Sequence, residues 1–150
     1  MLTSSTARVF VAREATITEK LTMTKLSNED AIATVATKDL KAARGFYEKT
    51  LGFRVDVANE PMAITFASGA TKVIVYQSSF AGTNRATAVN WIVKDVEGVV
   101  AELRSAGVSF EHYDMPGMTR TGDVHVAGGM KSAWFKDPDG NILCVMGVAA

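Results

Sequence analysis

The sequence predicts an α+β protein built from one strand–helix–strands module that is written twice. The first observation is a pair of helix patterns, at 39–52 and 95–107, whose apolar side chains recur at steps of three and four. The second is that each pattern begins with an aspartate suited to cap a helix and ends with a glycine suited to stop one. The third is a short apolar run before each helix and strand-like segments after it.

In the first module, the opening strand is expected at 31–37, and the helix that follows is bounded by Asp39 and Gly52. Alternation along the strand places Ile32, Thr34 and Ala36 on one face. Three further strands are expected after the helix, at 54–59, 63–67 and 72–77.

The second module repeats this order, with an opening strand at 88–93 and a helix at 96–105 that begins after Asp95. Its further strands are expected near 108–113, 131–136 and 142–146. Between them lies the long, Gly-rich segment 114–129, which is typical of a lid or binding loop. The residues Asp137-Pro138-Asp139-Gly140-Asn141 predict a tight hairpin turn.

Length and charge limit the possible classes of protein. A chain of 150 residues predicts one compact domain at 31–148, with modules of about 31–78 and 88–148, after an N-terminal arm at 1–30. Sixteen basic residues balance sixteen acidic ones, which argues against nucleic acid or an anionic membrane as partner. The single cysteine, Cys144, excludes an internal disulfide and favours a cytoplasmic location. No apolar run is long enough to span a membrane.

Several motifs resemble the vicinal oxygen chelate superfamily, which includes glyoxalase I, extradiol dioxygenases and bleomycin-resistance proteins. The motifs, in chain order, are Lys38-Asp39-Leu40, Phe46-Tyr47-Glu48, Leu51-Gly52-Phe53, Asp95-Val96 and Trp134-Phe135-Lys136-Asp137-Pro138-Asp139-Gly140-Asn141. The resemblance implies two βαβββ modules that form a curled mixed sheet around a central cleft, with the helices outside. It also implies a homodimer.

Enzymes of this superfamily hold a divalent metal with His and Glu side chains that project into the cleft. Motif spacing places the matching positions of this chain at Ile32, Ala88 and Cys144, with a fourth near Val75. Hydrocarbon side chains have no lone pair to donate, and one thiol cannot hold such a metal alone. We therefore expect no metal and no other cofactor.

His112 and His125 are the only histidines and could rebuild a metal site with Glu111, Asp114 or Asp123. The simpler interpretation is that both are solvent-facing or otherwise satisfied loop residues. Cys144 is interpreted as a small buried side chain, since a nucleophilic thiol would need a partner such as His125.

Trp91 is expected in the core, whereas Trp134 is expected to face the cleft. The cleft-facing strand positions combine apolar side chains with a few polar ones, which is typical of a small-molecule pocket. They are Ile32, Thr34, Ala36, Ala88, Asn90, Ile92 and Cys144. Methionines in and beside the long loop would suit an adaptable apolar lid.

The function predicted is metal-free binding of an apolar or aromatic, uncharged small molecule in the cleft. The predicted ligand-binding residues are Thr34, Asn90, Tyr113, Met118, His125, Trp134 and Cys144. One alternative is a metal-dependent lyase, isomerase or dioxygenase of the glyoxalase type with unusual ligands. Another is a scaffold whose cleft is filled by its own side chains and which binds another protein.

Overall fold

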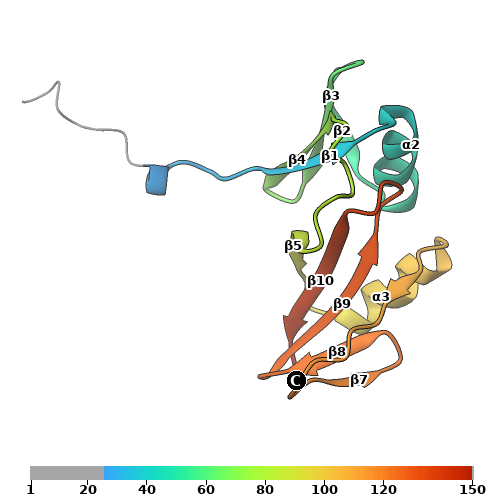
Figure 1. Cartoon of the computed structure of the whole chain (residues 1–150). Coiled ribbons are helices and arrows are strands. Elements are labelled where there is room, and N and C mark those ends of the chain that lie inside the picture. The colour runs from blue at the N-terminus through green and yellow to red at the C-terminus, as the bar shows by residue number, and fades with distance from the viewer. Residues whose placement is uncertain (1–25, 150) are drawn as a thin grey trace, which may run out of the picture. The chain divides into compact units, whose positions relative to one another are not determined.

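The computed structural model describes residues 26–149 (Figure 1). The predicted N-terminal arm lies outside the described residues up to position 25, and the short 3-10 turn η1 at Leu26–Asn28 follows. The compact unit that begins at Ile32 contains every other element.

The first module forms a four-stranded mixed sheet with one helical segment. Strand β1 (Ala33–Thr37) leads into helix α2 (Leu40–Gly45), which continues as the π-helical turn η2 (Phe46–Thr50). The remaining strands are β2 (Arg54–Asn59), β3 (Ala63–Ser68) and β4 (Thr71–Gln77). Their order is β1-β4-β3-β2, in which β1 runs parallel to β4 and the other pairs are antiparallel.

The second module repeats this plan and adds a hairpin. Strand β5 (Thr87–Ile92) precedes helix α3 (Val96–Ser105) and the two-residue strand β6 (Phe110–Glu111). The remaining strands are β7 (Thr119–Thr121), β8 (Val124–Ala127), β9 (Met130–Lys136) and β10 (Ile142–Val148). The order is β5-β10-β9-β8-β7, with β6 paired to β9 and β5 parallel to β10.

The predicted α+β class with a repeated module is confirmed, although the described strands form two separate mixed sheets. The predicted loop at 114–129 is only partly a loop, because β7 and β8 form a hairpin inside it. The predicted strand at 108–113 shrinks to β6, since only Phe110 and Glu111 pair with β9.

Both predicted helix caps are present. The Asp39 carboxylate accepts hydrogen bonds from the backbone N–H groups of Lys41 and Ala42, each at 3.0 Å, and Asp95 accepts one from Gly98 at 2.9 Å. Gly52 and Gly107, just past the two helical segments, have φ values of 73° and 90°. Among the described residues, neither helix has the length and apolar character needed to cross a bilayer, and the compartment stays a prediction.

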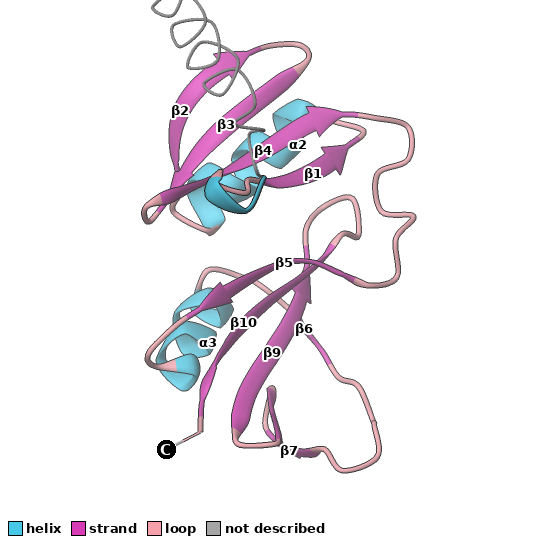
Figure 2. Ribbon diagram, turned by 90° about the vertical axis from the view of Figure 1, so that its left-hand side faces the viewer, coloured by secondary structure: helices cyan, strands magenta, loops and turns pink. Residues whose placement is uncertain are grey.

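Each helix covers one face of its own sheet (Figure 2). The core lies between the helices and the sheet faces that they cover. In β1, Val35 and Thr37 are buried on the helix side, whereas Thr34 is exposed on the other face, as alternation predicts. The largest fully buried side chains are Tyr47, Phe66, Phe135, Ile64 and Leu143. Tyr47 and Phe66 stack with ring centroids 5.6 Å apart.

The turn at 137–141 connects the two modules through hydrogen bonds. The Tyr47 hydroxyl donates to the Asp137 carboxylate at 3.0 Å, and the Asn141 amide donates to the Ala36 carbonyl at 2.7 Å. The Asp139 carboxylate accepts from the Thr37 hydroxyl and from the Lys38 backbone N–H. The predicted hairpin turn is therefore also the joint between the two modules.

Gly82 lets the linker between the modules pass directly over this turn. Its φ is 71°, and its N–H donates to the Asn141 side-chain oxygen at 3.1 Å. A Cβ at this position would lie 1.9 Å from the Asp139 carbonyl oxygen, a distance that no real contact has. Only glycine fits both the conformation and the space.

We expect Tyr47→Phe to lower the free energy of unfolding by roughly 1–3 kcal/mol, because the buried Asp137 carboxylate loses one of its donors. Urea denaturation measures the change. Tyr76→Phe is the matched control, since Tyr76 is exposed and its hydroxyl has no hydrogen bond among the described residues. Equal stability of Tyr47→Phe and the control would contradict the role assigned to the turn.

Candidate functional site

The face of each sheet opposite its helix, called here the open face, carries most of the predicted site residues. Strand pairing places Cys144 opposite both Asn90 on β5 and Trp134 on β9, so these three side chains share the open face of the second sheet. Asn90 is exposed, Trp134 is half-buried and Cys144 is buried. Thr34 is exposed on the open face of the first sheet.

The positions that would ligate a metal carry no suitable set of donors. Ile32 and Ala88 are exposed, and Val75 is fully buried on the helix side. The fourth position is therefore Ile74 and not Val75, because Ile74 pairs with Thr34 just as Cys144 pairs with Asn90. Within residues 26–149, no three His, Cys, Asp or Glu side chains gather as a metal site would require. The residues present do not fit the family's divalent metal.

A recess with aromatic walls lies on the open face of the second sheet. Its cavity volume is about 230 Å³, and its lining residues are Arg85, Ala86, Thr87, Tyr113, Met115, Trp134 and Ile142. The indole N–H of Trp134 donates to the Thr87 hydroxyl at 3.1 Å, which fixes the orientation of the ring. The Tyr113 ring meets Trp134 edge to face, with centroids 5.5 Å apart.

His125 supports this wall from within the sheet. It lies on β8 with 1% of its surface exposed, so the expectation of a solvent-facing or satisfied loop residue is wrong. Its Nε2 accepts from the Tyr113 backbone N–H at 3.0 Å, and its ring meets Trp134 edge to face at 5.1 Å. Its Nδ1 is the one buried side-chain nitrogen or oxygen without a partner among the described residues. Such an unpaired atom is costly in a structural position and common in functional ones.

Cys144 is buried and free, as predicted for a small packing side chain. Burial raises the pKa of its thiol to about 11, which leaves almost no thiolate near neutral pH. Its Sγ–H donates to the Val145 carbonyl oxygen at 3.4 Å. This thiol therefore acts as a buried packing side chain and not as a nucleophile.

The long segment after β6 contributes one of its methionines to the recess, although not Met118, the one predicted to bind the ligand. Met115 is among the lining residues, whereas Met118 is half-buried and lies outside the lining, as does Thr34. Four further lining positions were missed in the sequence: Arg85, Ala86, Thr87 and Ile142. They come beside Trp134 through the path of the linker that leads into β5 and through the pairing of Ile142 with Thr87.

A second, wholly apolar cavity of about 160 Å³ lies on the helix side. Its lining residues are Leu51, Phe53, Trp91, Val93, Val99, Leu103, Phe135 and Val145. Trp91 packs against Phe53 with centroids 5.6 Å apart, and its indole N–H donates to the Ser68 hydroxyl at 3.0 Å. Trp91 thus borders the core as predicted, and it connects the two modules.

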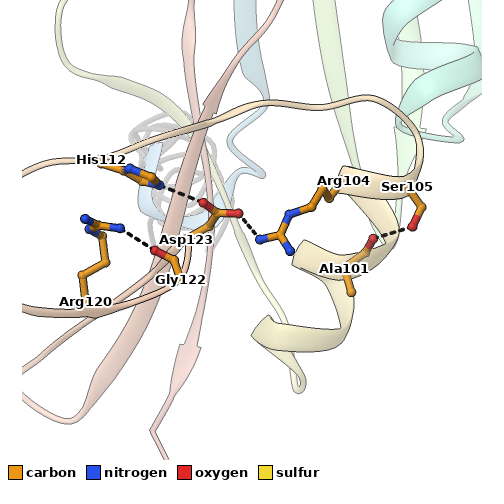
Figure 3. Close-up of polar contacts among 7 residues, drawn as sticks. All are labelled: Ala101, Arg104, Ser105, His112, Arg120, Gly122 and Asp123. Atoms are coloured by element: carbon orange, nitrogen blue, oxygen red, sulfur yellow. Dashed lines mark hydrogen bonds and ion pairs between the residues drawn. The ribbon is translucent and has the colours of Figure 1, made fainter.

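His112 does not join His125 in a metal site. Its Nε2 lies 2.8 Å from one Asp123 oxygen, and the other oxygen accepts from Arg104 on α3 (Figure 3). The Asp123 carboxylate thereby ties the β7–β8 hairpin to helix α3. The pKa of this carboxyl is lowered by the hydrogen bonds from Arg104 and from His112. A carboxylate shared by a guanidinium and an imidazole has a structural role here.

We expect Asp123→Asn to lower the free energy of unfolding by about 1 kcal/mol at pH 7, a small value because Arg104 is exposed. The lowered pKa of Asp123 means that its contribution is present above the ordinary carboxyl pKa and is lost as pH falls through the folded value. Urea denaturation between pH 7 and pH 3 should therefore show the two proteins converging at low pH. The control is Asp114→Asn, an exposed carboxylate with no ion pair in the described chain. A constant difference down to pH 3 would contradict this account.

Comparisons with known proteins agree with this geometry. Residues 30–145 match the family model of the Glyoxalase/Bleomycin resistance protein/Dioxygenase superfamily. No curated protein sequence matches the chain.

Three solved structures show the same fold at low identity. A protein assigned to the glyoxalase family from Bacillus anthracis has a TM-score of 0.64 and 18% identity, and the match covers 84% of this chain and 99% of that one. Lactoylglutathione lyase from Agrobacterium tumefaciens has a TM-score of 0.61 and 16% identity, covering 79% and 92%. A bleomycin-binding protein in complex with bleomycin has a TM-score of 0.61 and 17% identity, covering 79% and 98%. The chain belongs to the Glyoxalase/Bleomycin resistance protein/Dioxygenase superfamily.

Proposed function

We propose that this protein binds a small aromatic molecule in the recess on the open face and needs no metal to do so. The observation that carries the proposal is a combination of two features. Trp134 and Tyr113 wall a recess on the open face of the second sheet, while the positions that would ligate a metal are occupied by Ile32, Ile74, Ala88 and Cys144. Binding by burial requires shape and apolar surface and no reactive group.

The size of the recess limits what it can hold. Its volume of about 230 Å³ is below the range of roughly 300–1,000 Å³ for pockets that enclose a drug-sized ligand. One or two fused rings fit this space, and the rest of a larger molecule would extend over the open face. Burial of about 150 Å² of apolar ring surface contributes roughly 4 kcal/mol. Because association itself costs several kcal/mol, a bare ring is expected to bind weakly.

The competing proposal is a metal-dependent lyase, isomerase or dioxygenase of the glyoxalase type. The structural likeness to a lactoylglutathione lyase favours it. The donor set of this chain does not, because one buried thiol is the only metal-binding group at the four positions. Metal analysis of the purified protein distinguishes the two functions.

We expect Trp134→Ala to weaken binding of the neutral probe 2-naphthamide at least tenfold, because the naphthalene ring of the probe loses its contact with the indole that lines the recess. Isothermal titration calorimetry measures the affinity. Val99→Phe is the control, since it fills the helix-side cavity and leaves the recess intact. Elemental analysis of protein purified without chelator accompanies the titration.

Two results would contradict the proposed function. One is loss of binding in Val99→Phe with no change in Trp134→Ala, which would move the ligand to the helix side. The other is near-stoichiometric metal in the purified protein that is required for binding or turnover.

We also propose that two copies of the chain associate. Large apolar side chains remain exposed on the chain, and Ile92 on the open face of β5 is 80% exposed. Apolar surface of this kind is typical of interfaces. Light scattering should give the mass of two chains, and Ile92→Lys should shift the protein toward the monomer. A wild-type monomer at every concentration tested would contradict this proposal.

A further inference from the structure

Arg85 is the only charged residue in the lining of the recess. It lies in the linker immediately before β5, two residues from Thr87, whose hydroxyl orients the Trp134 ring. Within residues 26–149, none of the ion pairs includes Arg85. A guanidinium beside two aromatic rings therefore has no internal counter-charge in the described part of the chain.

Nearby carboxylates do not supply that counter-charge. Glu111 is the strand partner of Trp134, but its carboxylate lies 3.1 Å from the Lys136 ammonium group. Asp114 is exposed and is not part of the lining. A negative charge brought by a ligand would thus meet Arg85 without an acidic competitor in the recess.

The polar groups at the rim favour the same chemistry. Tyr113 lines the recess, and the hydroxyl of a tyrosine is protonated at neutral pH and can donate a hydrogen bond. A guanidinium offers a planar pair of N–H donors that matches the two oxygens of a carboxylate. The rim therefore presents donors, and the walls present ring surface.

We propose that the ligand of this recess is a planar aromatic ring bearing a carboxylate, with Arg85 pairing with the carboxylate and Trp134 and Tyr113 enclosing the ring. This inference rests on the proposed function and names its ligand class. It revises the uncharged ligand expected from the strand faces, because Arg85 lies on no strand and enters the site only through the linker. The pairing of the carboxylate with Arg85 would also add to the weak affinity expected for an aromatic ring without a charged group.

The test compares 2-naphthoate with 2-naphthamide, two ligands of equal size that differ in charge. We expect wild-type protein to bind 2-naphthoate about three- to tenfold more tightly at low salt, because an exposed charge-assisted pair contributes a modest amount. In Arg85→Gln the preference should disappear, and in Arg85→Lys it should be partly retained. The wild-type preference should also shrink at high ionic strength.

Arg54→Gln is the matched control, because Arg54 is an exposed arginine on β2 that lies outside the recess. It should keep the full preference for 2-naphthoate. Thermal unfolding of each variant checks that the fold is retained.

Each outcome decides between the two proposals. Equal affinity of the wild-type protein for both ligands, with loss of both in Trp134→Ala, overturns the carboxylate and leaves the proposed function standing. A preference that persists in Arg85→Gln overturns the assignment of Arg85. Absence of binding by both ligands overturns this inference and the proposed function together.

Discussion

The buried Asp137 carboxylate is the group on which the arrangement of this protein depends. Within its own turn, the carboxylate accepts hydrogen bonds from the backbone N–H groups of Asp139 and Asn141 and from the Asn141 side-chain amide. The Tyr47 hydroxyl of the other module supplies a fourth donor. Burial raises the pKa of this carboxyl, while these hydrogen bonds act in the opposite direction. A charged group at 5% exposure is tolerated only with such partners, so the modules must meet at this place.

That joint also fixes the strands that build the candidate site. The turn ends β9 and begins β10, and it sets the pairing of Trp134 with Cys144. Cys144 in turn pairs with Asn90 on β5. A shift by one residue would turn Trp134 toward the helix and Phe135 toward the open face. The recess, the oriented indole and the ring of His125 behind it therefore follow from a structural motif some distance away.

Much of the fold could be predicted because its signals are local. Asp39 and Asp95 cap their helices through backbone groups two or three residues away, and Gly52 adopts the positive φ that its position requires. Strand alternation placed Thr34 and Asn90 on the open side for the same reason. The hairpin formed by β7 and β8 was missed because its glycines resembled those of a mobile loop. His125 was misjudged with it, since its burial comes from Tyr113 and Trp134 and not from its own neighbours.

The sequence by itself determined the repeated module, the helix boundaries and the absence of metal donors at the family's ligand positions, because each depends on residue type at a fixed spacing. Only the tertiary structure decided that Ile74 and not Val75 matches Cys144, that His125 has an unpaired nitrogen, and that Arg85 joins Trp134 in one recess. These facts depend on the register of the paired strands and on the path of the linker between the modules. Both are set by contacts between residues far apart in the chain, which no local pattern records.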